Sequence, residues 1–98
     1  MKTTPLKYEK FKKYLKTYND RWAGFPNSYR WYFEFPNGYG VSVVKFYGTY
    51  GYEQDLFEIG TMYKGHLTNI KGITEDDQVL GYLTNDKVLY YLERILKL

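Results

Sequence analysis

Hydrophobic and polar residues alternate most regularly near the middle of the chain. Aromatic residues that can share one face occupy every second position over residues 29–35, which is the period-two pattern of a strand with one buried side. Asn37-Gly38 follows and suits the positive φ values of a type I′ turn. Apolar residues resume over residues 39–47. The pattern therefore predicts a β-hairpin whose buried face carries Tyr29, Trp31, Phe33 and Phe35.

Helical spacing dominates the two ends of the chain. Thr4 supplies an N-cap oxygen before Pro5, so a helix is expected to begin here. Apolar residues then recur every three to four positions, which predicts a helix that ends before Gly24. Its buried face would carry Tyr8, Phe11, Leu15, Tyr18 and Trp22. Thr84 is the expected cap of a terminal helix. Its apolar face would consist of Val88, Leu89, Leu92, Ile95 and Leu96.

Shorter signals fill the region between the hairpin and the terminal helix. Residues 56–63 predict a third strand, and a weaker fourth strand runs through Leu67 and Ile70. Thr74 precedes Glu75, Asp76 and Asp77, an acidic run that favours a helix start, and residues 79–83 predict a short helical turn. The expected fold is a single α+β domain over residues 1–98: an antiparallel three- to four-stranded β-meander packed with an N-terminal helix and a C-terminal helix, in the order α-β-β-β-(β)-α-α.

Composition adds a high aromatic content to this picture. Aromatic residues make up 21% of the 98 residues, and 13 of them are tyrosines, so some rings are expected at the surface, where tyrosine hydroxyls can bind water or a partner. The chain has no cysteine, which excludes disulfides and thiolate metal sites. It also lacks an apolar run of about 20 residues and the apolar centre of a secretory signal. We therefore expect a cytoplasmic protein of a host cell, without a membrane partner.

The sequence offers no recognisable catalytic or metal-binding constellation. His66 is the only histidine and follows a Lys-Gly turn, which favours an exposed surface residue. Glu53, Asp55 and Glu58 match no calcium-loop spacing, and the glycines form no phosphate-binding loop. We therefore expect a non-enzymatic protein with no catalytic residue, no metal and no cofactor.

Positive charge is concentrated at the start of the chain. Residues 2–21 contain seven basic and two acidic residues, whereas the remainder contains seven basic and nine acidic residues. On the predicted helix, four lysines could contact phosphates of a single-stranded nucleic acid: Lys10, Lys12, Lys13 and Lys16. The simpler interpretation is a solvated helix face. Nucleic-acid binding is thus the alternative function.

Three tyrosines are the expected contacts for a protein partner. Tyr32 points away from the predicted buried face of its strand, and Tyr50 and Tyr52 lie in a connection that Gly48 and Gly51 should make flexible. Tyrosine is one of the residue types that anchor protein interfaces. The sequence therefore predicts partner binding through these residues.

An ordered series of short motifs covers about two thirds of the chain, from Asn37 to the end. This series resembles a group of short, uncharacterised bacteriophage and prophage proteins, through Asn37-Gly38-Tyr39-Gly40-Val41-Ser42-Val43-Val44, Tyr50-Gly51, Leu56-Phe57-Glu58-Ile59, Ile73-Thr74 with Asp76-Asp77, and Gly81-Tyr82-Leu83-Thr84. The resemblance implies a phage origin and transfers no functional residue. Together with the tyrosines, it leads us to expect a protein that binds and inhibits or modulates a host or anti-phage defence protein, for example a CRISPR nuclease.

Overall fold

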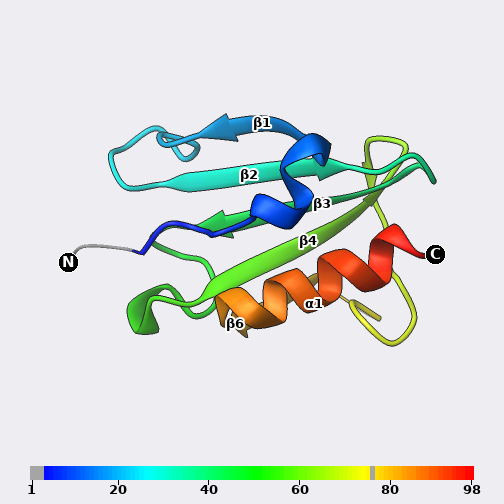
Figure 1. The fold of residues 1–98 in the computed structure, drawn as a ribbon. Coiled ribbons are helices and arrows are strands. Elements are labelled where there is room, and N and C mark those ends of the chain that lie inside the picture. Colours follow the sequence, from blue (N-terminus) through cyan, green and yellow to red (C-terminus); the bar gives the residue numbers. More distant parts are fainter. Residues whose placement is uncertain (1–3, 76) are drawn as a thin grey trace.

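The computed structural model describes residues 4–75 and 77–98. Within these residues the chain forms one six-stranded antiparallel sheet, one α-helix and two short 3-10 helices (Figure 1). The elements are η1 (Glu9–Tyr14), β1 (Leu15–Asn19), β2 (Tyr29–Glu34), β3 (Tyr39–Lys45), η2 (Tyr52–Gln54), β4 (Phe57–Tyr63), β5 (His66–Leu67), β6 (Val79–Leu83) and α1 (Asn85–Leu96). No helix in this described part of the chain is long and apolar enough to span a membrane.

The sheet is a meander in which β1, β2, β3 and β4 pair in chain order. The predicted hairpin is confirmed: β2 and β3 pair from Tyr29↔Lys45 to Glu34↔Gly40. The third strand is confirmed as β4, whereas the predicted fourth strand is reduced to the two residues of β5 and does not reach Ile70. Both β5 and β6 pair with the side of β4 that β3 leaves open. The α+β class and the antiparallel meander are therefore confirmed, but the predicted number of three to four strands is wrong, because β1 and β6 add two strands to the sheet.

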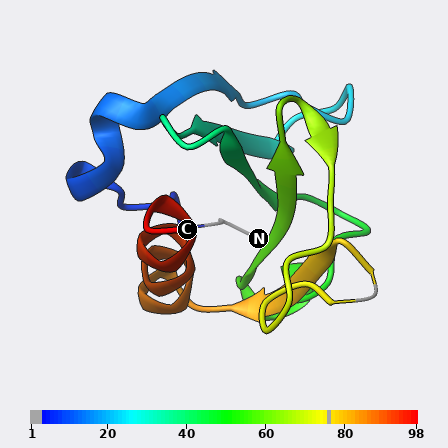
Figure 2. The same cartoon turned by 90° about the vertical axis from the view of Figure 1, so that its right-hand side faces the viewer.

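One face of the sheet carries the core. Figure 2 shows α1 and η1 on the same side of the sheet, with the strands curving around them. Thr84 caps α1 as predicted, because its Oγ1 accepts a hydrogen bond from the Lys87 N–H at 3.2 Å. The fully buried part of the core draws on η1, the sheet and α1 and contains Phe11, Phe33, Val41, Val43, Ile59, Val88, Leu92 and Ile95.

The predicted N-terminal helix is wrong. Only Glu9–Tyr14 is helical, as a short 3-10 segment, and Leu15–Asn19 is an edge strand paired with β2. A bulge lies between Leu15 and Thr17, since Leu15 pairs with Phe33 and Thr17 pairs with Tyr32. One extra residue places Leu15 and Tyr18 opposite the core-facing residues of β2. The bulge thus produces the three-residue spacing that we interpreted as helical.

The short helical turn predicted over residues 79–83 is wrong for the same reason. Residues Val79–Leu83 form β6, in which Leu80 pairs with Ile59 and Leu83 pairs with Phe57. Three residues on β6 therefore span two residues on β4, and this second bulge again gives apolar residues a helix-like spacing. Tyr82 adopts a positive φ of 59° inside this irregular stretch.

Thr74, Glu75 and Asp77, the described residues of the predicted helix start, are not helical. Thr74 is buried, and its Oγ1 lies 2.6 Å from Oγ1 of Thr61 and accepts the Ile70 N–H at 3.1 Å. The Thr74 side chain therefore joins the segment after β5 to β4 instead of capping a helix. Asp76, part of the predicted acidic turn, lies outside the described residues.

Candidate functional site

Four tyrosines surround a hollow at the end of the sheet where β3 stops. We call Tyr47, Tyr50, Tyr52 and Tyr82 the tyrosine cluster. The hollow has a volume of about 360 Å³ and is lined by these residues together with residues 48–54. Tyr47, Tyr50 and Tyr82 are 73%, 58% and 60% exposed, respectively. Three large, solvent-exposed rings thus lie close together, although they come from two distant parts of the sequence.

The connection that carries Tyr50, which the sequence predicts to be flexible, is held by several hydrogen bonds. Thr49 closes a turn, because its Oγ1 donates to the Phe46 carbonyl at 2.7 Å and accepts the Phe46 N–H at 3.2 Å. The Tyr50 N–H donates to Oε1 of Glu58 at 2.9 Å. The carbonyl of Tyr50 accepts the Tyr82 N–H at 3.2 Å. The loop is therefore fixed to both β4 and β6.

Glycine at position 81 permits the closest contact between this loop and β6. A Cβ atom at Gly81 would overlap with Cβ of Tyr50, so no other residue type fits at this position unless the loop moves. The close approach places the rings of Tyr50 and Tyr82 in a stacked arrangement, with centroids 6.3 Å apart and planes inclined by 27°. Stacked rings of this kind stabilise one another, so the cluster presents a preformed aromatic surface.

Tyr32 lies on the outer face of the sheet, opposite the core. It pairs with Ser42 in the middle of β3, whereas the tyrosine cluster begins beyond the end of β3 at Lys45. At about 3.3 Å per residue, Ser42 and Lys45 are about 10 Å apart. The structure therefore brings Tyr50 and Tyr52 together but places Tyr32 elsewhere, beside Arg30, whose guanidinium lies 4.9 Å from the Tyr32 ring centroid.

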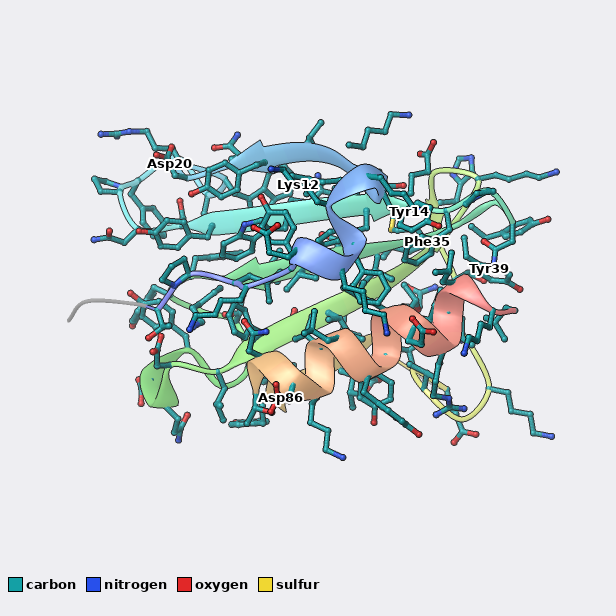
Figure 3. All side chains as sticks on the ribbon, viewed as in Figure 1. Lys12, Tyr14, Asp20, Phe35, Tyr39 and Asp86 are labelled. Atoms are coloured by element: carbon teal, nitrogen blue, oxygen red, sulfur yellow. The ribbon has the colours of Figure 1, made fainter. Side chains whose placement is uncertain are left out.

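The four lysines of the alternative interface do not share a helix face. Two of them pair with carboxylates: Nζ of Lys10 lies 3.6 Å from Glu93, and Nζ of Lys16 lies 3.1 Å from Glu34. Lys12 is exposed, and Lys13 lies over the ring of Tyr14. Figure 3 labels Lys12 near η1 and Tyr14 beside Phe35, against which the Tyr14 ring packs edge-on at 5.2 Å. The four lysines therefore have different contacts and do not form one continuous basic surface on a helix.

Several of the carboxylates considered from the sequence have structural partners. Asp55 forms an ion pair with the buried Lys45 at 2.7 Å, and Glu75 accepts the Gly72 N–H at 3.2 Å. His66 lies exposed on β5, in agreement with the surface position predicted for it. Across residues 4–75 and 77–98, no group of three or more histidine or carboxylate side chains is placed to hold a metal ion.

Three surface residues were missed from the sequence: Tyr82, Arg30, and Trp22, whose ring centroid lies 4.4 Å from the guanidinium of Arg30. Tyr82 was assigned to a helical turn, and its proximity to Tyr50 depends on a pairing between distant segments. Arg30 carried a readable signal, because it alternates with Trp31 and so shares the outer face with Tyr32. Trp22 carried no such signal, because the helix-like spacing of residues 8–22 predicts it on the buried side of a helix.

Comparison with known proteins adds no relative to these observations. No protein-family model, curated protein or solved structure matches the chain. The function is therefore inferred from the chemistry and geometry of the surface.

Proposed function

We propose that this chain is a phage-encoded, non-enzymatic protein that binds a host or anti-phage defence protein and inhibits or modulates it, with a CRISPR nuclease as one such target. The observation that carries this proposal is the tyrosine cluster. Tyr47, Tyr50 and Tyr82 are each more than half exposed, although large rings gain free energy when a partner removes them from water.

The rigidity of the cluster supports binding. Hydrogen bonds from Tyr50 to Glu58 and from Tyr82 to Tyr50 already fix the backbone. A tyrosine side chain also has only two χ angles, so little conformational entropy is lost when it enters an interface. A preformed surface of this kind binds with a smaller ordering cost than a mobile loop would.

The test is affinity capture with the tagged chain from a lysate of the bacterial host, performed with and without nuclease. The bait is compared with a Tyr50→Ser/Tyr82→Ser variant and with Tyr90→Ser. Tyr90 is a matched control, because it is a 51% exposed tyrosine on α1. We expect a protein that survives nuclease treatment, is lost with the double variant and is retained with Tyr90→Ser. The purified protein should then lose activity when the chain is added.

Nucleic-acid binding through Lys10, Lys12, Lys13 and Lys16 is the opposing outcome of this experiment. A captured protein that disappears after nuclease treatment would have been held through nucleic acid. Binding of a single-stranded oligonucleotide that weakens steeply with salt, and that is reduced in a Lys12→Gln/Lys13→Gln variant, would support that function instead.

A further inference from the structure

The outer face of the sheet contains a second concave surface, distinct from the tyrosine cluster. We call it the outer groove. It has a volume of about 300 Å³, and α1 and η1 lie on the opposite side of the sheet (Figure 2). Its floor is largely apolar and its rim carries an aromatic ring and an arginine; its principal lining residues are Trp22, Arg30, Ser42, Val44, Met62 and Leu67.

Arg30 is clamped at the rim of the outer groove. Its guanidinium lies 4.4 Å from the centroid of the Trp22 ring and 4.9 Å from that of Tyr32. Its Nε–H donates to Oγ of Ser42 at 2.8 Å. Cation–π contacts with two rings and one hydrogen bond hold the guanidinium in place before any ligand arrives.

The charge of Arg30 has no counterion within the described residues. None of the ion pairs found there includes Arg30, and only its Nε–H has a hydrogen-bond partner among them. Glu58 also lines the groove, but Oε1 of Glu58 accepts the Tyr50 N–H. Burial lowers the pKa of Arg30 from its ordinary value, yet a guanidinium remains protonated in proteins. The terminal nitrogens of a fixed cation are therefore available to an anion.

We propose that the outer groove binds an extended acidic segment of the partner protein, in which one Asp or Glu carboxylate pairs with Arg30 and a neighbouring apolar side chain lies over Val44 and Met62. The planar fork of arginine matches a carboxylate with two parallel hydrogen bonds. This inference rests on the proposed function in one respect, namely that the chain binds another protein.

The composition of the groove favours a peptide over a nucleic acid. A nucleic-acid strand is held by several cations that neutralise successive phosphates, whereas Arg30 is the only cationic residue among residues 4–75 and 77–98 that lines this groove. Val44, Met62 and Leu67 offer contacts to aliphatic side chains, which a sugar-phosphate backbone does not have. Trp, Tyr and Arg together are also the residue types that dominate binding energy at protein interfaces.

The test selects peptides from a random dodecapeptide display library on the immobilised full chain. The enriched peptides are then synthesised and their affinities measured for the unchanged chain, Arg30→Gln and Arg30→Lys. Arg21→Gln is the matched control, since Arg21 is an exposed arginine next to Trp22 that does not line the groove. Circular dichroism melting verifies that each variant is folded, and Trp22→Leu replaces Arg30→Gln if that variant is not.

We expect selected peptides that carry Asp or Glu beside a large apolar residue. Their affinity should fall about 10-fold or more for Arg30→Gln, as for loss of hydrogen bonds to a charged group. It should fall less for Arg30→Lys, which keeps the charge without the fork, and should be unchanged for Arg21→Gln. Trp22→Leu should weaken binding through loss of one ring of the clamp.

Three results would overturn the proposal: no enriched peptide, enrichment without acidic residues, or equal affinity for the Arg30→Gln variant. A single-stranded oligothymidylate that binds at low salt and is lost with Arg30→Gln would assign the groove to nucleic acid and overturn it too. Failure of the proposed function is recognised separately. In that case Tyr50→Ser/Tyr82→Ser captures the same host proteins as the unchanged chain, whatever the peptide selection shows.

Discussion

Lys45 and Asp55 form an ion pair in which the lysine is fully buried and the aspartate is partly exposed. Nζ of Lys45 lies 2.7 Å from Oδ1 of Asp55 and donates to the Thr4 carbonyl at 2.9 Å. The Thr4 N–H donates back to the same carboxylate at 3.0 Å. The pair therefore ties the start of the described chain to the end of β3 and to the turn after η2.

Removing the two charges of this pair should have unequal effects. Asp55→Asn leaves a buried ammonium without a counterion. Breaking a buried pair in this way lowers the free energy of unfolding by ~3–5 kcal/mol. We expect a loss near the lower end of this range, because Asp55 is partly exposed. Lys45→Met should cost less, since the remaining carboxylate can turn toward water. Urea unfolding of both variants measures the difference. A larger loss in Lys45→Met would contradict the view that the buried charge dominates.

The same pair makes stability depend on pH in the acid range. Burial raises the pKa of Asp55, but hydrogen bonds from Lys45 and Thr4 and the charge of Lys45 outweigh this, and the pKa lies below its ordinary value. The stabilisation is thus fully present above the unfolded pKa of about 4 and is lost as pH falls through the folded pKa. The difference in free energy of unfolding between the unchanged chain and Asp55→Asn should stay constant from pH 7 to about pH 5 and should shrink as the pH falls below the unfolded pKa of about 4. If the difference between the two proteins does not change with pH, the carboxyl group of Asp55 is not the origin of the pH-dependent stability.

Phe33 tests the assignment of the buried sheet face. Its side chain has no exposed surface, and Phe→Ala substitutions at such sites cost ~3–5 kcal/mol through lost burial and the cavity left behind. Phe25→Ala is the matched control, because Phe25 is 42% exposed, and should change the free energy of unfolding by less than about 1 kcal/mol. Denaturant midpoints that shift equally for both variants would show that the sheet faces are wrongly assigned.

The parts of the fold that could be predicted are those where local pattern and tertiary packing agree. The hairpin follows from alternation on both sides of Asn37-Gly38, and α1 follows from Thr84 and an apolar stripe of helical period. Leu15–Asn19 and Val79–Leu83 were mistaken for helix because each strand contains a bulge. A bulge shifts side chains to the other face by one residue, which turns a period of two into a spacing of three.

The candidate surface was only partly predictable for a related reason. Tyr50 and Tyr52 could be selected because glycine-rich connections often carry function. Tyr82 joins them through hydrogen bonding and packing between residues more than thirty positions apart, which a single sequence does not reveal. The clamp on Arg30 likewise combines the outer face of β2 with Trp22 from the preceding connection.

Gly81 should be needed for the tyrosine cluster to form. Gly81→Ala places a Cβ atom against Cβ of Tyr50, so the loop must move away from β6. We expect a loss of ~1–3 kcal/mol, as for other overpacked sites, accompanied by weaker partner binding. Gly60→Ala is the matched control in the neighbouring strand, since its nearest contact would be an ordinary 3.7 Å. Thermal melting of the two variants provides the comparison, and equal melting temperatures would mean that the loop yields without strain.

The exposed rings of Tyr50 and Tyr82 should contribute to binding and little to folding. Both are more than half exposed, and serine keeps the Cβ atom of Tyr50 that packs on Gly81. Tyr50→Ser/Tyr82→Ser should therefore lower the melting temperature only slightly, through loss of the stacked pair, while weakening the complex with the captured host protein by at least ~2 kcal/mol, the size of an interface hot spot. Calorimetric titration measures this loss, and Tyr90→Ser should bind as the unchanged chain does. If the double variant melts early yet binds normally per folded molecule, the two rings serve the stability of the loop, and the partner contacts another part of the surface.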